Sequence, residues 1–312
     1  MYDAPGPRTR RRTLIASIVA GIVVVALFLL LVIRPLANRG QFSMTLWGPI
    51  IDPSNQYFSL LWQRLGEGFQ GTLIAAALAI SASLICGVLL AVLRIQLLAW
   101  RRRRYTGLAT PIGWLVRGLI LVLNAVTRFA VEVFRGLPVV ITIFFVGRGL
   151  PEFGVDWPVL WYLVIGLTIY NMVVIAEILR SGMTGLPIGQ REAADSLGLT
   201  PFQTTRLILL PQAFRIMLPA LISQLVVVLK DTSLGFIISY EDLLNSAKLA
   251  VQVLNNPIQM YFTVGVIYIV VNYSLSKLAV YVQRRLERGR RAGQAQPVIV
   301  APAAVADEGA SA

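Results

Sequence analysis

Residues 14–33 form a run of twenty residues without a charged side chain. Runs of similar character occupy residues 72–93 and 159–176, and the stretches 214–238 and 258–282 are apolar with few charges. An α-helix crosses the hydrocarbon core of a bilayer with about 18–20 such residues. The sequence therefore predicts an all-α membrane protein in which each of these stretches is a span.

The composition supports this prediction and excludes several kinds of enzyme. Charged residues make up 14% of the chain, whereas average globular proteins carry about 25%. The chain has no histidine, which excludes histidine-based zinc sites and Ser–His triads, and Cys86 is its only cysteine. No Gly-Lys pair occurs, so the chain lacks the phosphate-binding loop of P-loop ATPases. We expect no metal, no cofactor and no catalytic carboxylate pair.

Basic residues precede the first apolar run. The run itself, residues 14–33, exceeds the roughly 7–15 residues of a secretory signal core, so we expect a retained membrane helix. Residues 1–13 are then a cytoplasmic basic N-terminus, and residues 34–67 form a polar outer loop. The Ala-, Pro- and Gly-rich tail, residues 289–312, is expected to be disordered.

The segment between residues 97 and 147 is the hardest to assign. Residues 112–127 are apolar but too short to span unaided, and residues 129–147 contain Glu132, Arg135 and Pro138 before a clean apolar run. We predict an interfacial or cytoplasmic helix at 112–127 that leads into a kinked span at 129–147. Six spans with both chain ends in the cytoplasm then result.

The distribution of basic residues agrees with this topology. Nineteen Lys and Arg residues fall in segments assigned to the cytoplasm and five in outer segments. Loops that remain in the cytoplasm carry such an excess of positive charge. The polar stretch between the spans at 159–176 and 214–238 is therefore predicted to be cytoplasmic.

That stretch, REAADSLGLTPFQTTRLILLP, has the signals of two helices joined by a tight turn. Residues 190–197 can form a short helix that Gly198 ends by adopting a left-handed backbone. Thr200 is a good N-cap and Pro201 suits the first turn of the next helix. We expect this second helix to end at Pro211.

The same stretch resembles the coupling loop of ABC importer permeases, in which Glu-Ala-Ala is followed at fixed spacing by Gly, Ile and Leu-Pro. The matching residues here are Glu192, Ala193, Ala194, Gly198, Ile208, Leu210 and Pro211. The resemblance implies that this loop lies in a groove of a separate ATP-hydrolysing subunit. Glu192 would be the polar anchor, and Ala193 and Ala194 would permit close approach.

Two other readings of this stretch remain open. A helix-turn-helix also binds DNA, but a position between two membrane spans argues against nucleic acid as a partner. A surface helix without any partner is the ordinary alternative.

Other segments are similar to permeases for polar amino acids. They are EVFRGLPVVITIFF (132–145), AEILRSGMTGLPIGQREAA (176–194) and LKDTSLGFIIS (229–239). The resemblance covers about residues 66–285 and departs from the family at residues 97–125, which look like an insertion. The extra first helix and the segment RGQFSMTLWGPI (39–50) resemble permeases of actinobacterial glutamate importers.

The resemblance implies the transmembrane domain of a type I ABC importer, with five core helices plus an extra N-terminal transmembrane helix. The permease domain would cover residues 68–288, and its coupling loop residues 186–211. The implied protein is not an enzyme. It would sit in a bacterial cell membrane and import a polar amino acid, glutamate in the narrowest reading. Its partners would be an ATP-binding subunit, a second permease subunit such as a sister chain, an external solute-binding protein and membrane lipid. The alternative is a secondary carrier driven by an ion gradient.

Polar residues within the expected spans are candidates for the translocation path or its gate. Lys230 and Asp231 either face a zwitterionic substrate or form a structural pair or helix break, and Thr232 and Ser233 either bind substrate or cap a helix. Asn171 and Gln224 either face the path or join helices by packing. The pairs Glu132–Arg135 and Glu177–Arg180 have the three-residue spacing of ion pairs along a helix.

Overall fold

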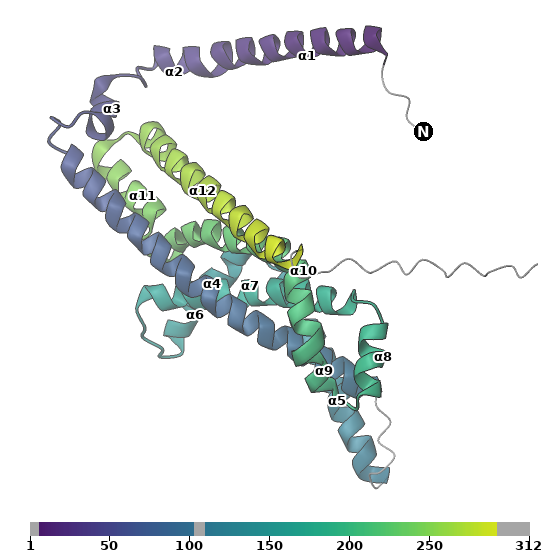
Figure 1. Cartoon of the computed structure of the whole chain (residues 1–312). Coiled ribbons are helices and arrows are strands. Elements are labelled where there is room, and N and C mark those ends of the chain that lie inside the picture. The colour runs from purple at the N-terminus through teal and green to yellow at the C-terminus, as the bar shows by residue number, and fades with distance from the viewer. Residues whose placement is uncertain (1–5, 103–109, 292–312) are drawn as a thin grey trace, which may run out of the picture.

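The computed structural model describes residues 6–102 and 110–291, and within these residues the chain is helical without strands (Figure 1). The elements in order are α1 (Pro7–Phe28), η1 (Leu29–Ile33), α2 (Arg34–Asn38), α3 (Met44–Ile51), α4 (Phe58–Arg102), α5 (Thr110–Gly136), α6 (Val139–Glu152), α7 (Val159–Thr184), α8 (Gly189–Ser196), α9 (Pro201–Thr204), η2 (Thr205–Leu209), α10 (Leu210–Asp231), η3 (Thr232–Ile238), α11 (Leu243–Leu254) and α12 (Pro257–Arg291). The all-α prediction is confirmed.

Six helical stretches in the described residues are long and apolar enough to cross a membrane, which confirms the predicted number. They are Pro7–Asn38, Phe58–Arg101, Ile112–Gly136, Val159–Thr184, Pro201–Ile238 and Pro257–Leu278.

The third of these stretches corrects a prediction. Residues 112–127 are not a separate interfacial helix, because they belong to α5, which continues unbroken to Gly136. The expected span at 129–147 is instead divided at Pro138, the N-cap of α6. Proline lacks a backbone N–H, and the residue before it disfavours the helical conformation, so one helix ends and another begins here.

The helix α7 lies at the centre of the bundle and packs against α4, α6 and α10. Its central side chains, among them Leu163, Leu167 and Leu179, are fully buried. A Cβ atom at Gly166 would lie 2.8 Å from the Cα atom of Ile143 in α6. The absence of a side chain at this position therefore allows α6 and α7 to approach closely, as small residues do in membrane bundles.

The segment predicted as a polar outer loop, residues 34–67, is largely ordered as helix. It contains α2, α3 and the first turns of α4. The side chain of Trp62 in α4 donates a hydrogen bond to the carbonyl oxygen of Ile50 at 3.0 Å, and Asn256 beside α12 donates to Leu46 at 3.0 Å. These bonds fix α3 across the ends of α4 and α12.

Helix α1 lies apart from the bundle (Figure 1), and all its residues are exposed within this chain. It begins at Pro7, so much of the basic segment 1–13 is helical, while residues 1–5 lie outside the described residues. At the other end, α12 extends to Arg291. The tail predicted from residue 289 can therefore begin no earlier than residue 292, and residues 292–312 lie outside the described residues.

Candidate functional site

The short helix α8, Gly189–Ser196, carries the Glu-Ala-Ala sequence and ends as predicted at Gly198, whose φ is 72°. The amide of Leu199 donates to the carbonyl oxygen of Ala194 at 3.1 Å, which closes the helix in the pattern of a Schellman motif. Ala194 is fully buried, whereas Glu192 and Ala193 are exposed. The helix therefore rests on the protein through Ala194 and presents the other two residues outward.

The turn after Gly198 is fixed by a reciprocal cap. The Thr200 hydroxyl accepts from the amide of Gln203 at 3.3 Å, and the Gln203 side chain accepts from the amide of Thr200 at 2.8 Å. This capping box confirms Thr200 as the N-cap and Pro201 as the first helical residue. The turn that joins α8 to α9 is thus rigidly defined.

The predicted end of this second helix at Pro211 is wrong. The helix continues through a π-helical turn, Thr205–Leu209, into α10. The amide of Leu210 donates to the carbonyl oxygen of Thr205, five residues earlier, so the turn is wider than in an α-helix. This wide turn ends two residues before Pro211, and the chain passes the proline while staying helical.

Two further hydrogen bonds attach α8 to the ends of the long helices. The Arg191 guanidinium donates to the carbonyl oxygen of Met183 at 3.4 Å, and the Gln212 amide donates to the Gln190 side chain at 3.1 Å. Apolar side chains beside the helix remain uncovered in this chain, with Ile188 73% exposed and Leu197 78% exposed. The segment is therefore held in place at its base and has an apolar, partly acidic outer surface.

The two side-chain amides proposed from the sequence, the buried Asn171 and the half-buried Gln224, contact each other. The Gln224 side chain in α10 donates to the Asn171 side-chain oxygen in α7 at 2.7 Å, and Asn171 donates to the carbonyl oxygen of Leu167 at 2.9 Å. Asn171 is fully buried. The geometry thus favours a tie between helices, one of the two alternatives for this pair.

Residues 230–233 lie where α10 changes into the 3-10 helix η3. The Thr232 hydroxyl donates to the carbonyl oxygen of Leu229 at 2.6 Å, and the Ser233 hydroxyl donates to that of Lys230 at 2.7 Å. Lys230 is exposed, and no ion pair joins it to Asp231 in the described structure. These four residues therefore mark the change from α-helix to 3-10 helix rather than an ion pair.

An ion pair network joins α4 to α7. Glu177 accepts hydrogen bonds from Arg180 in its own helix, as the spacing predicted, and also from Arg94 in α4. Arg94 was not among the predicted residues, because it lies 83 positions away and only the fold brings it close. The predicted pair Glu132–Arg135 is replaced by Arg128–Glu132, with 2.9 Å between Nε and Oε1.

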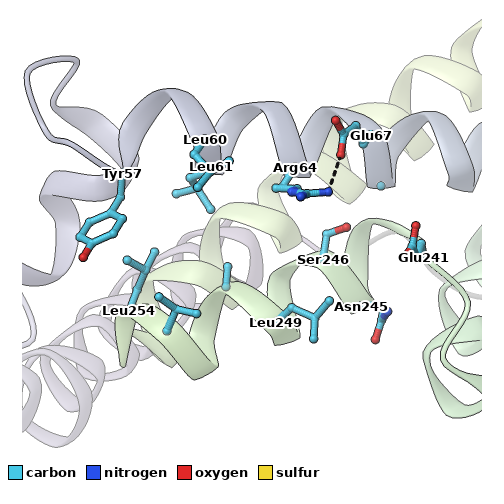
Figure 2. A pocket seen from close by; sticks show the side chains of 13 residues that line it. Tyr57, Leu60, Leu61, Arg64, Glu67, Glu241, Asn245, Ser246, Leu249 and Leu254 are labelled. Atoms are coloured by element: carbon cyan, nitrogen blue, oxygen red, sulfur yellow. Dashed lines mark hydrogen bonds and ion pairs between the residues drawn. The ribbon is translucent and has the colours of Figure 1, made fainter.

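A cavity of about 460 Å³ lies between the first turns of α4 and helix α11 (Figure 2). Figure 2 shows leucines from both helices at one end and the Arg64–Glu67 pair, Glu241 and Ser246 at the other. Within the described residues, no cluster of three or more Asp, Glu, Cys or His side chains could hold a metal ion.

The comparisons with known proteins decide the class of this molecule. Residues 109–288 match the family described as binding-protein-dependent transport system inner membrane component. The chain belongs to this family. The permease is 36% identical over 269 residues to the glutamate transport system permease protein GluD of Corynebacterium glutamicum, covering 85% of this chain and 87% of the relative. It is 32% identical over 241 residues to the probable glutamine ABC transporter permease protein GlnP of Bacillus subtilis, covering 75% and 95%.

Solved structures give the same fold. The permease superposes on a chain from the crystal structure of an amino acid ABC transporter with histidines at a TM-score of 0.59 and 26% identity, covering 74% of this chain and 99% of that one. The fold is that of a type I ABC importer. The chain is a multi-pass membrane permease, and ATP hydrolysis belongs to a separate subunit. The gradient-driven carrier is thereby overturned.

Proposed function

We propose that this permease imports a polar amino acid, with glutamate as the first candidate, and is driven through α8 by the ATP-hydrolysing subunit. The observation that carries the coupling role is the geometry of α8, which is fixed at its base by Ala194, Arg191 and Gln190 while Glu192 and Ala193 point outward. A rigid helix between two membrane spans transmits displacement without unfolding. Gly198, Leu210 and Pro211 shape the turn and the helix that follow it.

The substrate is proposed from the relatives. Their names give glutamate for GluD of Corynebacterium glutamicum, glutamine for GlnP of Bacillus subtilis, and glutamate and aspartate for the import permease GltK of Escherichia coli. All are polar amino acids with a carboxylate or carboxamide side chain. Glutamate is favoured because GluD, at 36% identity, is the most similar of these three and matches the largest share of this chain, 85%.

The remaining partners follow from this role. A second permease chain completes the pore, an external solute-binding protein delivers the amino acid, and lipid surrounds the spans. The charge distribution supports a bacterial cell membrane location with both chain ends in the cytoplasm. The cavity between α4 and α11 then lies on the outer side, where the solute-binding protein docks.

Transport itself proceeds by alternating access. Closure of the ATP-binding subunits displaces α8, and the movement passes to α10 and to the change of helix type at Lys230–Ser233. This junction is the candidate gate, because hydroxyl and charged groups are concentrated where the α-helix changes into a 3-10 helix.

Co-purification of the permease with its ATP-binding subunit in detergent tests this proposal. Glu192→Lys should reduce the captured ATPase by about tenfold, because reversing one charge at the centre of an interface costs at least about 1.4 kcal/mol. Glu152→Lys is the matched control, since Glu152 is exposed at the far end of α6. Equal capture by the wild type and the Glu192 variant would refute the coupling role.

A further inference from the structure

Gln96 of α4 joins the inner end of that helix to the junction that follows the coupling turn. Its side chain is 5% exposed, and its amide nitrogen donates to the hydroxyl of Thr205 at 2.9 Å and to the carbonyl oxygen of Pro201 at 3.3 Å. The Thr205 hydroxyl in turn donates to the same carbonyl oxygen at 2.8 Å. Three polar groups from two segments more than 100 residues apart thus form one closed set of hydrogen bonds.

The two residues that Gln96 contacts occupy a decisive place in the chain. Pro201 is the first residue after the capped turn, and Thr205 begins the π-helical turn that leads into α10. π-helical turns recur at functional sites and at places where a helix can change its geometry. Gln96 therefore holds both Pro201, the first residue of α9, and the π-helical turn that begins at Thr205 against α4.

The opposite side of α4 is bound to α7 only two residues earlier. Arg94 donates to Glu177 of α7, while Gln96 donates to Pro201 of α9 and Thr205 of η2, the turn at the base of α10. Since successive helical residues point about 100° apart, these two side chains leave α4 on different sides. The inner end of α4 is thus a bridge between α7, which precedes α8, and the segment that follows α8.

An alternative role for Gln96 is simple packing. Packing alone would be served by an apolar side chain, whereas the buried Gln96 side-chain oxygen has no hydrogen-bond partner in the described structure. An unpaired buried carbonyl is unfavourable. The amide occupies this position despite that cost, and its donor group is aimed at Thr205 and Pro201.

We infer that Gln96 is a positioning residue that makes the inner half of α4 move together with the base of α10 when α8 is displaced. This inference rests on the proposed coupling role of α8 and extends it to a helix that carries none of the family's coupling sequence. Movement of α8 then reaches α7 through the chain and reaches α4 through Gln96. Without that contact, the inner half of α4 follows α10 less closely and part of each ATP cycle is lost.

The test uses the complete transporter, reconstituted with its ATP-binding subunit and solute-binding protein in vesicles. Gln96→Met keeps the length of the side chain without a donor, and Thr205→Val removes the hydroxyl while Thr205→Ser keeps it. Amino acid imported per ATP hydrolysed should fall by roughly 3- to 10-fold in the first two variants, the range for loss of one contact in a coupled network. Thr205→Ser should match the wild type.

A matched control is Ser81→Ala, which removes an exposed hydrogen bond within α4 itself. This variant should leave the import ratio, the amino acid imported per ATP hydrolysed, unchanged. An unchanged ratio in Gln96→Met would overturn the inference, whereas a wild type that captures no ATPase would overturn the proposed function instead.

If the Gln96 and Thr205 variants assemble poorly, a distance measurement without these substitutions still tests the inference. Spin labels at the exposed positions Leu93 and Leu207, in a Cys86→Ser chain, report the separation of α4 from η2. The distance should be the same in nucleotide-free and ATP-trapped wild type, because the two segments move as one. A shift of several ångströms between these states would contradict joint movement.

Discussion

The side-chain amide of Gln224 donates to the side-chain oxygen of Asn171 at 2.7 Å and thereby joins α10 to α7 inside the bundle. Replacing Asn171 with Leu leaves that amide without its acceptor. The free energy of unfolding in detergent should fall by about 1–2 kcal/mol, the scale of polar contacts between membrane helices. The double change Asn171→Leu with Gln224→Leu should recover part of this loss. If the stability losses of the two single variants simply add in the double variant, or if transport is lost while stability is unchanged, the pair instead faces the translocation path.

The ion pair network around Glu177 has a similar joining role between α4 and α7. Side-chain exposures of 17% for Arg94, 21% for Glu177 and 31% for Arg180 place it between surface and core. Glu177→Gln leaves two guanidinium groups facing each other and should cost about 2 kcal/mol, less than the 3–5 of a fully buried pair. Glu132→Gln breaks the exposed pair with Arg128 and should cost no more than about 0.5 kcal/mol. Equal losses in the two variants, measured by unfolding in mixed micelles, would refute this ranking.

Two glycines of α4, only two residues apart, should respond oppositely to alanine. A Cβ atom at Gly68 would lie 2.2 Å from the Ser246 hydroxyl and 2.7 Å from the Asp242 carbonyl oxygen, whereas one at Gly66 meets nothing within 4 Å. Gly68→Ala should therefore destabilise the protein by about 1–3 kcal/mol through forced separation of α4 and α11. Gly66→Ala should stabilise it by roughly 0.5–1 kcal/mol. Melting temperatures in detergent give the sign of each change.

Asp242 should make stability depend on pH. Its carboxyl caps α11 by accepting from the Asn245 amide at 2.7 Å, and burial raises its pKa to about 7 from the usual 3.8. The folded protein therefore holds this proton more tightly than the unfolded chain. The contribution of Asp242 to stability is complete below about pH 4 and is lost as pH rises to about 7.

Asp242→Asn keeps the cap but removes the titration. Between pH 5 and 7 the wild type should lose roughly 1–2 kcal/mol more than this variant, and above pH 7 the variant should be the more stable. Thermal unfolding in detergent across this range measures both. A parallel pH dependence in the two proteins would contradict the assignment to Asp242.

Local signals in the sequence were sufficient for much of this fold. Continuous apolar runs marked the spans, and Gly198, Thr200 and Pro201 marked the coupling turn, because caps and turns depend on neighbouring residues alone. Charged residues hid the continuity of α5, since Arg117, Arg128 and Glu132 lower its hydropathy without breaking the helix. Hydropathy measures composition and does not report where a helix ends.

The contacts missed from the sequence are those made between distant segments. Arg94 meets Glu177 and Gln96 meets Thr205 only after α4, α7 and α10 pack, and no local spacing indicates either pair. The sequence predicts a helix end at Pro211 because proline usually interrupts a helix, whereas here a π-helical turn precedes the proline and the helix continues.

Uptake of labelled glutamate into vesicles tests the central claim most directly. The vesicles hold this permease with its second permease chain and ATP-binding subunit, and the solute-binding protein is supplied outside. Import should require ATP and should continue when ionophores abolish all ion gradients. Import by the permease without ATP, driven by an imposed gradient and stopped by ionophores, would contradict the account.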